Sequence, residues 1–133
     1  MPQIPQGLSE EQFAAISAVI RAATTHLGSD IQIHGSRVQG TARFESDIDI
    51  AIRLPSEEFG AFLQDRFGAP NPGSAKERTM QWARDRGKIQ AGEAGLRALR
   101  KELEAYLGIE VDISVIRLGG PFDQPPFLPL KAN

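Results

Sequence analysis

The segment DIDIAIRL, residues 47–54, alternates strictly between apolar side chains and other side chains. This period of two predicts a β-strand with one face in the core. The apolar face carries Ile48, Ile50, Ile52 and Leu54. Asp47 and Asp49 therefore share the opposite face, because they are two residues apart. Two carboxylates this close repel each other, so the fold must supply a positive charge or keep one of them protonated.

Two further segments show the same strand pattern. IQIH at residues 31–34 and IEVDISVI at residues 109–116 alternate and are rich in isoleucine. In the second segment the apolar face takes Val111, Ile113 and Val115. Asp112 then lies on the other face. If this strand neighbours the 47–54 strand, Asp112 joins the two aspartates.

Capping residues and apolar spacing predict four helices around these strands. The capping residues are Ser9 with Gln12, Ser56, and Ser74 with Glu77, and the fourth helix carries Leu96, Leu99, Leu103 and Leu107. Gly28 and Gly108 are predicted to end the first and the fourth helix. The third helix has a poor apolar stripe, so we expect it to face solvent or a ligand.

The C-terminal segment LGGPFDQPPFLPL is rich in proline, which cannot donate a hydrogen bond within a sheet. We expect it to lie along the surface as an extended tail rather than in the sheet. The predicted organisation is one domain at residues 1–118 and an extended tail at residues 119–133. A chain of 133 residues with 41% hydrophobic residues has enough apolar material for one core.

Composition excludes several classes of protein. The chain has no run of about 18 apolar residues and no basic, then apolar, N-terminal segment, so we expect a soluble chain that neither spans a membrane nor directs its own export. Without cysteine it has no disulfide and no thiolate metal site. The net charge of −2 hides a basic segment, Lys76–Lys101, with eight Lys or Arg and three Asp or Glu. This segment could meet an anion locally, but an extended basic stripe for nucleic acid is missing.

Three carboxylates on one patch predict a bound cation. Oxygen ligands without His or Cys partners suit Mg²⁺ or Mn²⁺ rather than zinc. Gly35 and Ser36 follow the 31–34 strand, where glycine allows a tight turn. The main-chain amides and the Ser36 hydroxyl could then face an anion. The residues therefore predict a phosphate site beside a metal site.

These features together resemble the nucleotidyltransferase superfamily related to DNA polymerase β. The resemblance is carried by Gly-Ser at 35 and 36, ten intervening residues, Asp-Ile-Asp at 47–49, and the later Asp112. The stretch GSRVQGTARFESDIDIAI is especially similar to the minimal nucleotidyltransferases of bacterial toxin and antitoxin systems. The resemblance implies an α/β (α+β) fold, with a small mixed β-sheet flanked by helices. It also implies an EC 2.7.7 type reaction, in which an acceptor hydroxyl attacks the α-phosphorus of a nucleoside triphosphate (NTP) and pyrophosphate leaves.

The resemblance also implies roles for individual residues. Asp47 and Asp49 would hold two magnesium ions, and Asp112 would complete the catalytic metal site and help to deprotonate the acceptor. Gly35 and Ser36 would hold the β- and γ-phosphates. His34 departs from the family, which usually has a hydrophobic residue there. For His34 we favour a hydrogen-bonded histidine at a strand end.

For each of the basic and aromatic residues near these motifs, two interpretations stay open. Arg37 and Arg43 either contact phosphate or are solvated beside the turn. The basic side chains Lys76, Arg78, Arg84, Arg86 and Lys88 hold the RNA acceptor or the triphosphate, or they form a charged surface helix. Trp82 either stacks on a nucleobase or packs, partly buried, against the rest of the protein.

A second resemblance concerns the residues from Pro70 to Asp123. They are similar in character to C-terminal toxin domains of polymorphic or contact-dependent bacterial toxins. This implies action in the cytoplasm as a growth-inhibiting toxin, delivery as the end of a larger secreted protein, RNA such as a tRNA end as acceptor, and an immunity or antitoxin protein as partner. No DNA partner is expected. The alternatives are an enzyme that modifies a protein or small molecule, and a module that binds a nucleotide or partner without turnover.

Overall fold

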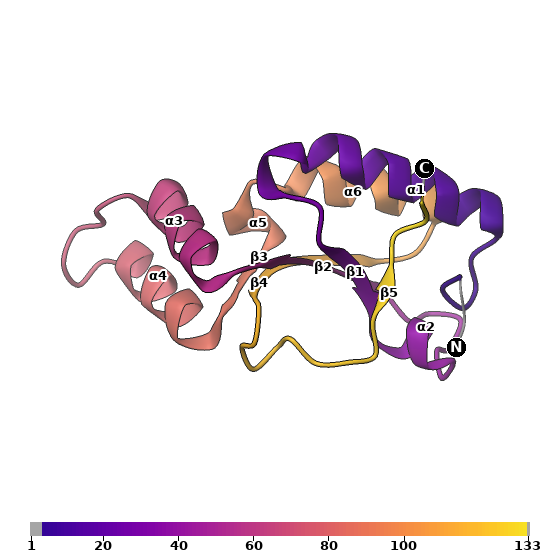
Figure 1. Cartoon of the computed structure of the whole chain (residues 1–133). Helices are drawn as coiled ribbons and strands as arrows, with labels where there is room; N and C mark the ends of the chain where they lie inside the picture. Colours follow the sequence, from indigo (N-terminus) through magenta and orange to yellow (C-terminus); the bar gives the residue numbers. More distant parts are fainter. Residues whose placement is uncertain (1–3, 133) are drawn as a thin grey trace.

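The computed structural model describes residues 4–132, which contain one five-stranded sheet (Figure 1). Its strands are β1 (Ile31–His34), β2 (Ile48–Leu54), β3 (Lys88–Gln90), β4 (Val111–Arg117) and β5 (Leu128–Pro129). The strand order is β3-β4-β2-β1-β5. β2 and β4 are parallel, and the other neighbouring pairs are antiparallel. The predicted fold class, a small mixed sheet with helices, is confirmed.

Helices lie over one face of the sheet and beyond both of its ends (Figure 1). They are α1 (Glu10–Ala23), η1 (Thr25–Leu27, a 3₁₀ turn), α2 (Ser36–Gln39), α3 (Ser56–Phe67), α4 (Ala75–Arg86), α5 (Ala91–Ala94) and α6 (Arg97–Leu107). In Figure 1, α1 and α6 lie over one face, and α3 and α4 lie beyond one end of the strands. The segment between β4 and β5 crosses the opposite face.

The alternation in β2 separates these two faces. Ile48, Ile50 and Ile52 are buried in the same core as the apolar residues of α1 and α6. The core residues of these two helices are Phe13, Ile16, Ile20, Leu99 and Leu103. The other face of β2, which carries the aspartate, is therefore the one that the β4–β5 segment crosses.

The first helix begins as predicted but ends early. The Ser9 hydroxyl accepts a hydrogen bond from the Gln12 amide at 3.0 Å, and Gln12 Oε1 accepts one from the Ser9 amide at 2.8 Å, so the capping box is confirmed. The prediction that the helix runs to Gly28 is wrong. The Thr24 hydroxyl donates to the carbonyl of Ile20 at 2.7 Å, and the chain continues as the 3₁₀ turn η1.

The later helices correct two further expectations and confirm one. Ser56 is the first helical residue, and Pro55 occupies the cap position without a side-chain hydrogen bond. Ser74 caps α4, but Glu77 Oε1 accepts from the amide of Gly73 instead of that of Ser74, so only half of the capping box forms. α6 ends at Gly108 as predicted. Strand β3, between α4 and α5, was not predicted.

The expectation that the tail lies outside the sheet is wrong for Leu128 and Pro129. These residues form β5, in which Leu128 is paired with Ile33 of β1 and Pro129 with Gln32. Proline is tolerated there because β5 is an edge strand. The main-chain amide of Lys131 then donates to the buried Ser17 hydroxyl of α1 at 3.0 Å. The division into residues 1–118 and 119–133 stays a prediction.

Leu130 tests the structural contribution of this segment. Its side chain is 7% exposed and belongs to the core. Leu130→Ala should lower the free energy of unfolding by about 2 to 5 kcal/mol, because it leaves a cavity. Lys131→Ala is the matched control, since its exposed ion pair with Glu10 contributes at most about 1 kcal/mol. Urea unfolding followed by circular dichroism measures both, and equal stabilities would contradict a packed C-terminal segment.

Candidate functional site

Three side chains form a row across the polar face of the sheet. His34 of β1 is paired with Asp49 of β2, and Asp49 is paired with Asp112 of β4. Paired residues on neighbouring strands project from the same face, with Cβ atoms about 5 Å apart. Asp47 lies one residue before β2 and is exposed. The predicted meeting of Asp112 with Asp49 therefore follows directly from the parallel register.

A cavity of about 230 Å³ opens over this row, and we call it the carboxylate cavity. It is bounded by four strands and by one residue of the β4–β5 segment. The lining residues are His34, Asp49, Ile50, Ala51, Lys88, Asp112, Ser114, Ile116 and Phe122. The cavity thus joins two acidic side chains, a histidine and a lysine in one small space.

The carboxylate cavity is short of positive charge. Burial raises the pKa of Asp49 from its ordinary value of 3.8 to about 6, and repulsion from Asp47 and Asp112 adds to this rise. Lys88 acts in the opposite direction but does not cancel it. A second positive charge at this position would favour the ionised carboxylate.

Gly35 lies directly against Asp49. Its φ of 83° is in the left-handed region, and a Cβ atom built on Gly35 would overlap Oδ2 of Asp49. Glycine is therefore required both by the backbone and by the close carboxylate. The Gly-Ser motif and the Asp-x-Asp motif are in contact, although more than ten residues separate Gly35 from Asp49 in the chain.

Ser36 begins the short helix α2 beside this contact. The amides of Val38 and Gln39 donate to the Gly35 carbonyl at 3.0 Å each, which closes a tight turn. Within residues 4–132 the Ser36 hydroxyl makes no hydrogen bond. It is thus available to a ligand next to Asp49.

Arg37 does not fit the phosphate role predicted for it. Its side chain is 4% exposed. The guanidinium donates to the main-chain carbonyls of Gln6 at 2.7 Å, Ser46 at 3.1 Å and Phe44 at 3.4 Å. These bonds fix the loop that precedes β2, so Arg37 positions the aspartates indirectly. Arg43 is exposed, and its phosphate contact stays a prediction.

The structure separates the basic residues of the predicted acceptor set. Lys88 alone of this set lines the carboxylate cavity. Arg78 lines a neighbouring cavity, and Arg84 lines another that lies against Gln64 and Gly68. Lys76 and Arg86 are exposed on α4. The five side chains therefore do not form one patch at the carboxylates, and their role toward the acceptor stays a prediction.

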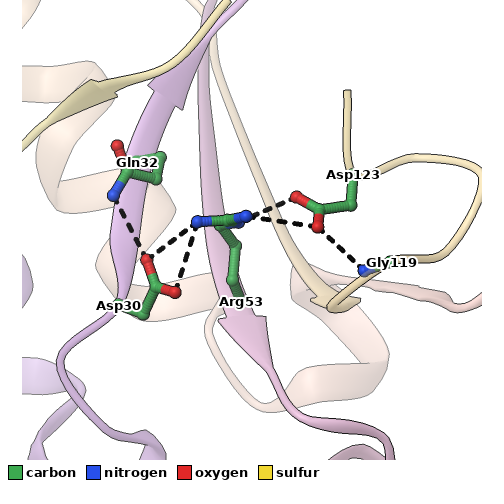
Figure 2. A network of polar contacts seen from close by, with 5 residues as sticks. All are labelled: Asp30, Gln32, Arg53, Gly119 and Asp123. Carbon is green, nitrogen blue, oxygen red and sulfur yellow. Dashed lines mark hydrogen bonds and ion pairs between the residues drawn. The ribbon is translucent and has the colours of Figure 1, made fainter. Parts of the chain in front are cut away.

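Sequence reasoning missed the contribution of the β4–β5 segment. Arg53, on the same face as Asp49, donates to the Asp123 carboxylate at 2.8 and 3.2 Å and to Asp30 at 3.3 Å (Figure 2). The amide of Gly119 also donates to Asp123, at 2.9 Å. The hydrogen bond from Arg53 lowers the pKa of Asp123. The sequence could have indicated this network, because the alternation of β2 places Arg53 on the same face as Asp47 and Asp49.

Aromatic residues of the same segment contact the row. The guanidinium of Arg53 lies 4.5 Å from the ring centre of Phe127, and the rings of His34 and Phe127 meet edge-on at 4.8 Å. The Lys88 ammonium lies 4.6 Å from the ring centre of Phe122. The predicted surface tail is therefore a wall of the carboxylate cavity.

The expectation that His34 is a hydrogen-bonded histidine at a strand end is confirmed in part, because its ring hydrogen-bonds to the main chain of Gln124. Its Nε2 atom is buried and has no hydrogen-bond partner among residues 4–132. Burial lowers the pKa of His34, and the Asp123 carboxylate partly opposes this effect. The imidazole thus lines the carboxylate cavity with one ring nitrogen unpaired among the described residues.

Comparison with protein families matches the chain over residues 17–129 to the family described as "Nucleotidyltransferase domain". The chain belongs to the nucleotidyltransferase family. This membership supports a transferase of the EC 2.7.7 kind with an NTP as substrate, and such domains commonly use divalent metals. No curated protein and no solved structure matches the chain. Within residues 4–132, no helix of the nucleotidyltransferase is long and apolar enough to cross a membrane.

Gly35→Ala tests the contact between the two motifs of this nucleotidyltransferase. The new methyl group should displace the Asp49 carboxylate and change the pKa of Asp49, which carboxyl NMR measures. Gly40→Ala is the matched control, because Gly40 has nearly the same φ of 82° with no atom within 4 Å of a built Cβ. Both variants should lose about 1 to 2 kcal/mol of stability from the backbone alone. Asp49 should keep its pKa of about 6 only in Gly40→Ala.

The raised pKa of Asp49 also predicts a pH dependence of stability. Between pH 4 and 6 the folded chain keeps a proton on Asp49 that the unfolded chain has lost, so this group's contribution to stability falls as the pH rises. Asp49→Asn removes the effect. In buffers without divalent metal, the variant should become more stable relative to the wild type as the pH rises through this window. Urea unfolding at several pH values measures the difference, and the exposed Asp65→Asn should show no such trend.

Proposed function

We propose that the chain transfers a nucleotide from an NTP to a hydroxyl group of RNA, such as a tRNA end, in a reaction that depends on Mg²⁺ or Mn²⁺. The observation that supports it best is the adjacency of Asp49 and Asp112 on parallel strands, with the Gly35–Ser36 turn in contact with Asp49. Acidic oxygens and a free hydroxyl beside a tight turn suit a metal and a phosphate together.

The residues fit a divalent cation in chemistry. Carboxylate oxygens are the preferred ligands of Mg²⁺, and the raised pKa of Asp49 reflects a shortage of nearby positive charge. Within residues 4–132 no three His, Cys, Asp or Glu side chains form a ready metal cage. This suits Mg²⁺, which is usually bound through one or two carboxylates and the phosphates of a substrate. Asp47, Asp49 and Asp112 would hold two such ions, which supply Lewis-acid charge at the α-phosphate.

The chain's own groups have distinct roles in this proposal. The Ser36 hydroxyl and the main chain at Gly35 bind the β- and γ-phosphates. Asp112 takes the proton of the acceptor hydroxyl, whose oxygen forms a bond to the α-phosphorus. The bond from that phosphorus to the bridging oxygen breaks, and pyrophosphate leaves. Lys88, half-buried at the cavity, offsets the negative charge of the phosphates.

We further propose that the protein acts in the bacterial cytoplasm, where this transfer reaction inhibits growth, and that an immunity or antitoxin protein blocks it. The similarity of residues 35–52 to toxin-associated minimal nucleotidyltransferases supports this part. Delivery at the end of a larger secreted protein belongs to the same proposal. An RNA acceptor is supported by the basic composition of Lys76–Lys101.

A second candidate is a module that binds an NTP or a partner without turnover. The position of Asp47 favours it, because Asp47 is exposed and does not line the carboxylate cavity. Turnover therefore separates the two candidates.

Asp112→Asn gives the sharpest test of the enzyme. The chain is incubated with Mg²⁺, labelled NTPs and total cell extract, and the label is then followed through nuclease and protease digestion. The wild type should label a nuclease-sensitive acceptor. Asp112→Asn should lower the rate about 10²- to 10⁴-fold, because the proton acceptor is lost, and keep much of the NTP affinity. Asp49→Asn should lose both the transfer activity and the NTP affinity, and Asp65→Asn should keep both.

Three results would count against parts of the proposal. Unchanged transfer by Asp112→Asn would remove Asp112 from the chemistry. Loss of the label on protease digestion would show that the acceptor is a protein and not RNA. Growth of cells that express the wild type as fast as cells that express Asp112→Asn would remove the toxin role.

A further inference from the structure

A second cavity of about 360 Å³ adjoins the carboxylate cavity. It lies between α4, β3 and α5, and we call it the Trp82 cavity. Trp82 and Ala83 line it from α4, Ile89 and Gln90 from β3, and Glu93 from α5. Lys88 lines both cavities, so they meet at its side chain.

Strand pairing places the Trp82 cavity one strand away from the aspartates. Gln90 of β3 is paired with Ser114 of β4, and Ser114 lines the carboxylate cavity two residues beyond Asp112. With about 4.8 Å between strands and 3.3 Å per residue, the Cα atoms of Gln90 and Asp112 are roughly 8 Å apart. A single sugar can bridge such a separation between a base and a phosphate.

The lining suits a flat aromatic ligand. Ala83 and Ile89 are buried and give an apolar floor. The Trp82 side chain remains 44% exposed, with the guanidinium of Arg86 5.7 Å from its ring centre. An exposed tryptophan at an apolar cavity offers a stacking surface for a nucleobase.

Charge distinguishes the Trp82 cavity from the residue that it shares with the carboxylate cavity. Glu93 is exposed at the Trp82 cavity. Within residues 4–132, neither the Glu93 carboxylate nor the side-chain amide of Gln90 makes a hydrogen bond. An ionised carboxylate accepts hydrogen bonds from base N–H groups but repels phosphate. Lys88 lies at the junction, where it attracts phosphate. The Trp82 cavity therefore suits a base, and the junction suits the phosphates.

We propose that the Trp82 cavity binds the nucleobase of the donor NTP. Trp82 stacks on the base, and Glu93 and Gln90 bond to its edge. The ribose passes Lys88, so that the α-phosphate reaches Asp49 and Asp112. This inference rests on the nucleotide chemistry proposed above and makes Trp82 a base-binding residue.

The single tryptophan of the sequence makes a direct test possible. In the presence of Mg²⁺, each NTP that binds should quench the wild-type fluorescence, whereas tripolyphosphate, which has no base, should bind with little quenching. By calorimetry, Trp82→Ala should weaken NTP binding about 5- to 150-fold, as expected for a lost stacking contact. It should leave tripolyphosphate affinity unchanged, and Trp82→Phe should restore most of the NTP affinity.

Tyr106→Ala is the matched control. Tyr106 is a similarly exposed aromatic residue, but it lies on α6 over the opposite face of the sheet. This variant should bind NTP and tripolyphosphate as the wild type does. Equal loss in Trp82→Ala and Tyr106→Ala would assign the effect to general stability and overturn the proposal.

Other outcomes separate this inference from the enzymatic proposal. If Trp82→Ala keeps its NTP affinity while transfer by the wild type is confirmed, the base site is wrong and the enzyme stands. If Trp82→Ala raises only the KM for the acceptor, the cavity holds an acceptor base and the inference is overturned. In the third case, NTPs quench Trp82 fluorescence and Trp82→Ala weakens NTP binding, but the wild type transfers no nucleotide. This result would support the base site and contradict the enzymatic proposal.

Discussion

The parallel pairing of β2 with β4 is the constraint on which the site depends. It places Asp49 beside Asp112 and, on the other face, Ile50 beside Ile113. Because β-strand side chains alternate, burial of the isoleucines in the core fixes the carboxylates on the opposite face. A shift of β4 by one residue would turn Ile113 to the polar face and Asp112 into the core. The hydrophobic core thus determines where the acidic groups meet.

Arg53 extends this arrangement to the segment after β4. It projects from the same face as Asp49 and binds Asp30 and Asp123 from two different parts of the chain. Arg53 is largely buried, and both carboxylates oppose its charge. The paired charges therefore hold the β4–β5 segment across the polar face without drawing on the carboxylates of the cavity. Arg53 is thus engaged by Asp30 and Asp123, and it is not the charge that compensates Asp49.

Sequence patterns predicted the parts of this fold that depend on local chemistry. The alternation of residues 47–54 and 109–116, the capping box at Ser9 and the leucine spacing of α6 depend on neighbours in the chain. The sequence predicted a phosphate site beside the metal site, but it did not predict the direct contact of Gly35 with Asp49. Strand β3 was missed because three residues, Lys88–Gln90, are too short to show a period.

Long-range contacts account for the remaining errors. The proline-rich composition of residues 118–130 indicated a surface tail, but pairing of Leu128 with Ile33 cannot be read from local composition. Arg37 beside a Gly-Ser turn looked like a phosphate ligand. Its burial depends on carbonyls of Gln6 and Ser46, which no local pattern reveals. The roles of Asp47, Asp49 and Asp112 in chemistry remain predictions, whereas the geometry around Asp49 is defined.

The short strand β5 limits how another protein can associate with the sheet. Pro129 has no amide hydrogen, so this edge offers little for the main chain of a second protein to pair with. At the other edge, β3 has three residues and is followed directly by α5. Neither edge is a good template for an added strand. A protein that binds at this sheet would therefore contact side chains rather than main-chain edges, and Phe122, which lines the carboxylate cavity, is an exposed side chain of this kind.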